Sequence, residues 1–198
     1  MNDAVKFGSA LAGGEKLPGQ LPHHAFTLAL VGNPNAGKTT LFNALTGLRA
    51  KTANFPGTTV ERRVGRTHFG DRQTVLVDLP GLYSLESSSP EEKLASDALH
   101  GRLENHPAPE AALVVVDATN LERNLFLVSQ VLELGCPVVV ALNMMDTARR
   151  DGIRIDVAKL QAELGCPVVP ISARTGMGFG ELKDAFAQER LDRRTNAR

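Results

Sequence analysis

One stretch of the sequence, residues 32–39, has the residue types and spacing of a phosphate-binding loop. Gly32-Asn33-Pro34-Asn35-Ala36-Gly37-Lys38-Thr39 matches G-x-x-x-x-G-K-[ST] at every fixed position. Glycines permit a tight turn in which successive backbone N–H groups face one anion. Lys38 suits the β- and γ-phosphates, and the hydroxyl of Thr39 suits Mg²⁺. The loop predicts a bound nucleoside triphosphate and leaves its base open.

A second pair of motifs, closer to the C-terminal end, predicts which base is bound. Asn143-Met144-Met145-Asp146 follows an apolar run, and Ser172-Ala173-Arg174 follows the next one. The Asp146 carboxylate can accept hydrogen bonds from the ring N–H and the exocyclic amine of guanine, whereas adenine lacks this pair of donors. A backbone N–H of the Ser172-Ala173 segment can meet the guanine carbonyl oxygen. The order and spacing of these motifs favour GTP over ATP.

Two short motifs between these regions predict the Mg²⁺ site and the switch elements. In Asp78-Leu79-Pro80-Gly81, Asp78 is expected to hold Mg²⁺ through water, and the Gly81 N–H is expected to sense the γ-phosphate. In Gly57-Thr58-Thr59, one threonine is expected to bind Mg²⁺ when GTP is present. We favour Thr59, with a simple strand-forming role as the alternative for both threonines. The residues expected to contact GTP are Gly32, Asn33, Pro34, Asn35, Ala36, Gly37, Lys38, Thr39, Thr40, Gly57, Thr58, Thr59, Asp78, Leu79, Pro80, Gly81, Asn143, Met144, Met145, Asp146, Ser172, Ala173 and Arg174.

The elements that must position these motifs alternate between strands and helices. Strands are predicted at 26–31, 60–69, 73–78, 111–117, 137–142 and 167–171. Helices are predicted at 38–46, 120–134, 156–165 and 178–190, with another beginning at Ser89-Pro90. This order predicts an α/β fold of the P-loop GTPase type. We expect a doubly wound, six-stranded, mostly parallel sheet with one antiparallel edge strand and helices on both faces.

Length and composition fit one domain. The 198 residues carry 22 basic and 22 acidic side chains, so no overall basic field favours a nucleic-acid partner. Two cysteines cannot build a disulfide framework, and no apolar run is long enough to span a membrane. We expect a flexible leader at 1–25, a GTPase domain at 26–190, and a frayed end or the start of a further region at 191–198.

The motifs together resemble the cytosolic G domain of the ferrous iron transport protein B (FeoB) family over about residues 26–188. The most specific segments are Pro56-Gly57-Thr58-Thr59-Val60-Glu61 and Asp117-Ala118-Thr119-Asn120-Leu121-Glu122-Arg123-Asn124-Leu125. The resemblance implies a GTPase module on the cytoplasmic side of the bacterial inner membrane, tethered to a membrane domain that moves Fe²⁺. It does not exclude a homo-oligomer. The family continues into helical and membrane regions that this chain does not include.

Catalysis is expected to be slow. Ras-type enzymes orient the attacking water with a glutamine at the position of Leu82, and an alkyl group cannot do this. Relatives with asparagine at position 35 use K⁺ where an arginine finger would lie. By this resemblance, the Asn35 side chain and the backbone carbonyls near Ala53 and Phe55 would hold K⁺. The alternative is that Asn35 only tolerates a positive-φ turn. The residues expected to act in hydrolysis are Asn35, Lys38, Thr59 and Gly81.

Three function classes remain open at this level. The first and favoured class is a GTP switch that serves ferrous iron uptake. The second is a soluble ribosome-assembly or RNA-modification GTPase of the related K⁺-dependent group, which usually carries N-K-x-D where this chain has Met144. The third is a nucleotide-binding scaffold that does not hydrolyse GTP. Because this chain has Met144 in place of the lysine of N-K-x-D, we predict micromolar affinity for the nucleotide and fast release of GDP.

Overall fold

The fold is built on one mixed sheet that carries the predicted motifs at its edge. The computed structural model describes residues 26–47, 50–55, 58–69, 72–86, 89–104 and 107–196. The strands are β1 (Phe26–Gly32), β2 (Ala50–Asn54), β3 (Glu61–Phe69), β4 (Arg72–Asp78), β5 (Ala111–Asp117), β6 (Val138–Asn143) and β7 (Val168–Pro170). The helices are α1 (Lys38–Thr46), α2 (Pro90–Leu99), α3 (Leu121–Glu133), α4 (Met145–Arg150), α5 (Val157–Leu164) and α6 (Phe179–Asn196).

The strand order is β2-β3-β4-β1-β5-β6-β7, so the described sheet has seven strands and the predicted number of six was wrong. The five strands from β4 to β7 in this order pair in parallel, as predicted. β3 pairs antiparallel with β4 on one side and with β2 on the other. The extra strand, β2, therefore extends the antiparallel edge of the sheet.

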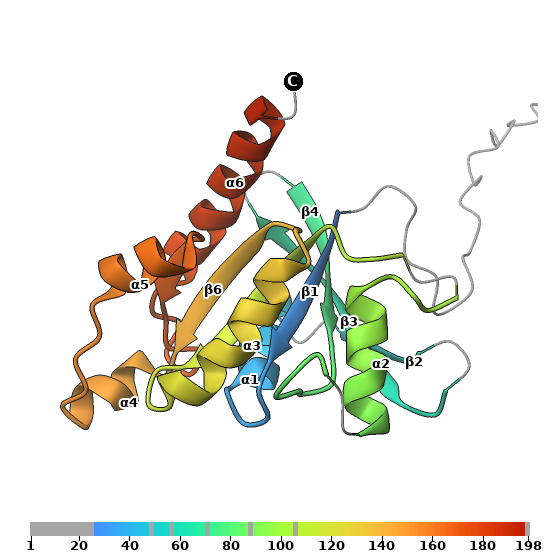
Figure 1. Cartoon of the computed structure of the whole chain (residues 1–198), viewed down its shortest axis with the longest axis horizontal. Helices are drawn as coiled ribbons and strands as arrows, with labels where there is room; N and C mark the ends of the chain where they lie inside the picture. The colour runs from blue at the N-terminus through green and yellow to red at the C-terminus, as the bar shows by residue number, and fades with distance from the viewer. Residues whose placement is uncertain are drawn as a thin grey trace, which may run out of the picture.

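The central strands are largely apolar because both faces of the sheet are covered. β1 and β6 are buried at every position. Leu94 of α2 and Leu127 of α3 belong to the core on one face. Phe42 of α1 and Phe186 of α6 belong to the core on the other face. This layered arrangement of helices around the sheet is visible in Figure 1, and it confirms the doubly wound prediction.

Most helix starts and ends follow the local signals in the sequence. Gly47, in the left-handed conformation with φ 61°, ends α1 as predicted. The Ser89 side chain accepts the N–H of Glu92 and caps α2, whose first residue is Pro90. α6 continues to Asn196, past the predicted end at residue 190.

Several predictions fall on parts of the chain that the structure does not describe. The predicted leader, 1–25, lies outside the described residues, as do Gly57 and residues 197–198.

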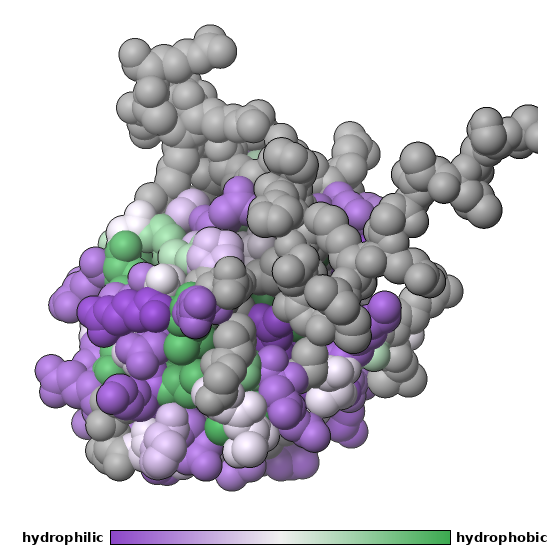
Figure 2. Space-filling model, turned by 90° about the vertical axis from the view of Figure 1, so that its right-hand side faces the viewer, coloured by the Kyte–Doolittle hydropathy of each residue, from purple (hydrophilic) through white to green (hydrophobic). Residues whose placement is uncertain are grey.

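No helix in the described part of the chain combines the length and the apolar character that crossing a membrane requires. The face that carries α2 and the antiparallel edge is predominantly polar where its residues are described (Figure 2).

Candidate functional site

The predicted motifs meet at the carboxyl ends of the parallel strands. The loop 32–39 follows β1, Asp78 is the last residue of β4, and Asn143 is the last residue of β6. Ser172 lies just after β7. Because parallel strands end at the same edge of a sheet, segments far apart in the sequence lie side by side there (Figure 1).

The P-loop (residues 32–39) turns sharply into α1. Ala36 N–H donates to Asn33 O at 3.2 Å, and Gly37 precedes α1 with φ 89°. A β-carbon at Gly37 would overlap Nδ2 of Asn143, and residues other than glycine rarely adopt this φ. Glycine at position 37 therefore allows both the turn and the close approach of β6. Backbone amides at the start of a helix that follows such a turn are suited to bind an anion.

Lys38 and Asp78 form an ion pair at the phosphate end of the site. Lys38 Nζ lies 3.0 Å from Asp78 Oδ1, and the two side chains are only 11% and 8% exposed. The predicted phosphate-binding cation and the predicted Mg²⁺-binding carboxylate are thus neighbours. The hydroxyl-bearing Thr39 is exposed at the first turn of α1.

The segment after Asp78 runs close to the P-loop. Leu82 N–H donates to Gly32 O at 3.3 Å, and a β-carbon on Gly81 would lie 3.1 Å from Pro34 N. The N–H of Gly81 therefore lies in the segment that borders the P-loop, as its predicted role requires. The Leu82 side chain is fully buried in the core on the α2 and α3 side. It points away from solvent and has no polar atom to offer to water.

Asn143 joins the P-loop to the loop after β7, a role that the sequence reasoning missed. Its Nδ2 donates to Ala36 O at 2.9 Å, and its Oδ1 accepts from Ala173 N–H at 2.9 Å. Asn143 is 3% exposed, so both hydrogen bonds are buried. A backbone N–H of the Ser172-Ala173 segment was predicted to meet the guanine carbonyl, but in this arrangement Ala173 N–H donates to Asn143 and Ser172 N–H donates to Met177 O.

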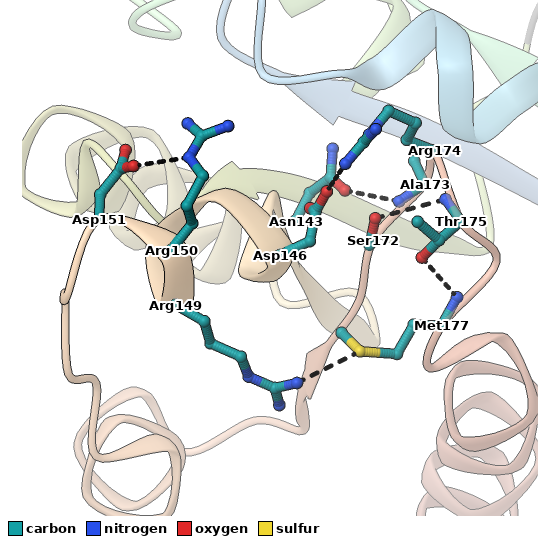
Figure 3. A network of polar contacts seen from close by, with 10 residues as sticks. All are labelled: Asn143, Asp146, Arg149, Arg150, Asp151, Ser172, Ala173, Arg174, Thr175 and Met177. Atoms are coloured by element: carbon teal, nitrogen blue, oxygen red, sulfur yellow. Dashed lines mark hydrogen bonds and ion pairs between the residues drawn. The ribbon is translucent and has the colours of Figure 1, made fainter.

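Asp146, the predicted base-binding residue, is paired with Arg174. Asp146 Oδ2 accepts a hydrogen bond from Arg174 Nη2 at 2.5 Å. The hydrogen bond from Arg174, with a further one from Ser172 and the arginine charge, holds the pKa of Asp146 below its ordinary value against the opposing effect of burial. Figure 3 shows Asn143, Asp146, Ser172, Ala173 and Arg174 lying close together.

Met144 and Met145 place Asp146 at this point. Met144 has φ 62°, and its methyl group lies 3.7 Å from the position a β-carbon on Gly37 would take. The methionine therefore reaches the P-loop without bringing a charge. Met145 is 7% exposed, and its N–H donates to Ile171 O at 3.2 Å.

The two threonines near position 58 differ in their surroundings. Thr58 N–H and Oγ1 both donate to Phe55 O, at 3.1 and 3.2 Å, and Thr58 Oγ1 accepts from Val60 N–H. Thr58 is thereby part of the turn before β3. Thr59 is exposed, which leaves its side chain accessible to solvent. Gly57, between Thr58 and Pro56, lies outside the described residues.

The three groups assigned to K⁺ occupy separate local structures. Asn35 is exposed with φ 67°, which is the conformation that its alternative role requires. Ala53 lies in β2 opposite Arg62 of β3. Phe55 is 1% exposed and its carbonyl oxygen already accepts two hydrogen bonds from Thr58. In this arrangement the Phe55 carbonyl is not free to bind a cation.

Asn33, which was predicted to contact GTP, is also linked to residues for which no role in the site was predicted. Asn33 is 3% exposed, and its Nδ2 donates to Arg123 O at 3.3 Å. The Arg123 guanidinium lies 4.1 Å from the centroid of the Tyr83 ring. Tyr83 N–H in turn donates to Glu92 Oε1 at 3.2 Å. These contacts connect the P-loop directly to Arg123 of α3 and, through Tyr83, onward to Glu92 of α2.

The described residues contain no group of three or more His, Cys, Asp or Glu side chains that could hold a metal ion. The oxygen donors predicted for Mg²⁺ are of a different kind: one carboxylate, Asp78, and the hydroxyls of Thr39 and Thr59. Hard oxygen donors in small number fit Mg²⁺, which keeps several waters and takes its remaining ligands from phosphates.

Comparison with known proteins agrees with this arrangement. The family model described as "Ferrous iron transport protein B" matches residues 26–186. The chain is 50% identical over 161 residues to the Fe(2+) transporter FeoB of Escherichia coli K12, covering 81% of this chain and 21% of that transporter. The chain thus spans about a fifth of the length of the transporters it matches.

Solved structures show the same fold. The FeoB G-domain from Methanococcus jannaschii is 42% identical, with a TM-score of 0.71, and the match covers 83% of this chain and 97% of that one. A mutant of S. thermophilus NFeoB bound to mGDP is 44% identical, with a TM-score of 0.73, over 83% of this chain and 60% of that one. The chain therefore belongs to the ferrous iron transport protein B family and has the fold of its G domains.

Proposed function

We propose that residues 26–190 form a GTP-binding domain that hydrolyses GTP slowly and acts as a switch. One observation supports this above all others. Asn143 holds the P-loop and the loop after β7 together through two buried hydrogen bonds. The proposed phosphate-binding turn is thereby joined to the loop that carries Arg174, the partner of the proposed base-binding Asp146, at one edge of the sheet.

At the phosphate end, the amides of the P-loop and the start of α1 would surround the β- and γ-phosphates. Lys38 would exchange Asp78 for a phosphate oxygen, since both are anions within reach of the same ammonium group. Thr39, Thr59 and, through water, Asp78 would hold Mg²⁺. When bound, Mg²⁺ neutralises charge on the phosphates. The Gly81 N–H would donate to the γ-phosphate, so that its loss is felt by the segment that continues to Leu82.

The binding test compares nucleotides by calorimetry. We expect heat with GDP and GTP in the presence of Mg²⁺, micromolar dissociation constants, and no measurable binding of ADP. Lys38→Ala should remove binding of both guanine nucleotides. Equal binding of ADP and GDP would contradict the proposal. The relative bound to mGDP supports the same ligand class for this chain.

We propose that hydrolysis is slow because the Leu82 side chain cannot orient the attacking water. Replacing Leu82 by Gln is expected to lower the free energy of unfolding by about 2 to 4 kcal/mol, because it buries an amide without partners in an apolar core. The GTPase rate should not rise, because the backbone directs this side chain into the core. Leu82→Met, which conserves volume, should cost less than about 1.5 kcal/mol. A stable Leu82→Gln variant with faster hydrolysis would show that position 82 can face the nucleotide.

The finer proposal is that K⁺ stimulates hydrolysis through Asn35, with the backbone near Ala53 and Phe55. The turn at Thr58 would have to open first, because it occupies the Phe55 carbonyl. We expect hydrolysis about tenfold or more faster in KCl than in NaCl of equal ionic strength, as for a preorganised charge at the transition state. Asn35→Ala should remove the difference.

Asn35→Gly is the matched control, because glycine accepts φ 67° at no cost while it removes the side-chain ligand. If Asn35 serves only the turn, the glycine variant keeps the K⁺ stimulation. If Asn35 binds K⁺, both variants lose it. Equal rates of the unchanged protein in the two salts would end the K⁺ proposal.

The role of the whole protein is a further proposal, since the chain spans 21% of the E. coli transporter it matches. We propose that this domain lies on the cytoplasmic side of the inner membrane. It would serve a membrane-embedded domain of the same protein that carries Fe²⁺, and that could assemble as a homo-oligomer. Uptake of ⁵⁵Fe²⁺ by cells expressing the full-length protein tests this. Uptake that is unaffected by Lys38→Ala would separate the domain from iron transport.

A further inference from the structure

The base end of the site contains an ion pair that bears directly on guanine binding. The carboxylate predicted to bind guanine already has a partner, because Arg174 Nη2 lies 2.5 Å from Asp146 Oδ2. Arg174 follows Ala173, whose N–H is held by Asn143. In Figure 3 the arginine side chain folds back from the loop after β7 toward Asp146 at the start of α4.

The guanidinium group and the base share one chemical feature. Guanine presents a ring N–H next to an exocyclic NH₂ on the same carbon, and a guanidinium presents two N–H donors in the same planar arrangement. Both suit the two oxygens of a carboxylate. The Arg174 side chain therefore resembles the part of guanine that Asp146 is expected to bind.

The surroundings make this contact easy to break. The side chain of Arg174 is 77% exposed, whereas that of Asp146 is 23% exposed. Arg174 can therefore rotate into solvent while the backbone of the loop stays in place, fixed by the buried hydrogen bond between Ala173 and Asn143. An exposed ion pair contributes little to folding, so its removal does not endanger the fold.

We propose that Arg174 is an internal competitor for guanine, which occupies Asp146 in the nucleotide-free protein and must leave before the base can bind. This inference rests on the proposed function and adds a residue that sets the rate of nucleotide entry. It also assigns Arg174 a role different from the direct base contact predicted from the sequence.

The first test uses the protein without nucleotide. The groups that act on Asp146 are Arg174 and Ser172 from the loop after β7 and, through space, Arg150 of α4. Following the Asp146 carboxyl by ¹³C NMR, we expect a higher pKa in Arg174→Ala than in the unchanged protein. The ion pair holds at neutral pH and is lost as pH falls through the lowered pKa of Asp146. Identical titrations would overturn the inference, whether or not GDP binds.

The second test measures association of a fluorescent GDP analogue by stopped flow. Arg174→Ala is expected to raise the association rate constant about two- to fivefold at low salt, the range for losing an exposed ion pair. The gain should shrink at high NaCl, which screens the pair. Arg150→Ala is the matched control. It removes the same charge close to the site, but Arg150 forms its ion pair with Asp151.

The outcomes separate the two proposals. If the unchanged protein binds no guanine nucleotide, the proposed function fails while the NMR result still reports on the ion pair. If Arg174→Ala binds GDP more slowly or at the same rate, Arg174 is not a competitor. An equal gain in the association rate constant in Arg150→Ala would show that the effect depends only on the net charge near the site. This result would also overturn the inference.

Discussion

Replacing Asp146 by Asn is expected to lower the affinity for GDP about 100-fold, because hydrogen bonds from guanine to an ionised carboxylate are replaced by a neutral amide with one donor facing a donor. The same change should let xanthosine diphosphate bind, since xanthine has a carbonyl where guanine has its amine. Calorimetry or competition with a fluorescent nucleotide measures both affinities. This reversal of preference distinguishes a lost base contact from general damage.

Asp151→Asn provides the matched control for this substitution. Asp151 lies at the end of α4, is exposed, and pairs with Arg150 outside the site. It removes the same charge from the same helix, so its GDP affinity should stay within about twofold of the unchanged protein, as for an exposed pair of little net effect. GDP binding that is equally strong in Asp146→Asn would contradict the assignment of the base site.

The positions of the site elements could be predicted from the sequence because each motif is tied to a local signal. β1 is a largely apolar run, the P-loop ends in Gly37-Lys38-Thr39, and Gly47 ends α1. Such signals act within a few residues. The carboxyl-edge location then follows from the parallel connection alone.

The elements that escaped prediction depend on contacts made elsewhere in the fold. β2 has the sequence AKTAN, which favours no strand, and it is extended because β3 offers a free edge for pairing. α4 is too short to show a period of its own. Tertiary pairing, which no local pattern reveals, decided both.

The same reason explains what was missed within the site. The sequence identifies Lys38, Asp78, Asp146 and Arg174 as candidates, but not that they pair with one another. Each ion pair joins segments at least 28 residues apart in the chain. Lys38 pairs with Asp78 and Asp146 pairs with Arg174, so the charges predicted to contact phosphate, Mg²⁺ and base neutralise each other in pairs. Under the proposed function, ligand binding would exchange these partners at both ends of the site.

The largest structural effect is expected for Asn143→Ala. The substitution leaves Ala36 O and Ala173 N–H without their partner, and both residues are almost fully buried. Leaving two buried polar groups unsatisfied should lower the free energy of unfolding by about 2 to 4 kcal/mol. Urea unfolding monitored by circular dichroism measures this. Asn120→Ala, at an exposed position with no side-chain capping bond, should change it by less than about 0.5 kcal/mol.

Unfolding in the presence of GDP shows whether Asn143 matters to the site as well as to the fold. A ligand at 100 times its dissociation constant stabilises the native state by about 2.7 kcal/mol, so GDP should shift the unfolding of the unchanged protein and of Asn120→Ala by this amount. Asn143→Ala should show a much smaller shift, because the P-loop and the loop after β7 are no longer held together. A full GDP shift in Asn143→Ala would mean that nucleotide binding alone can align the two loops, and the buried amide would then be a folding element only.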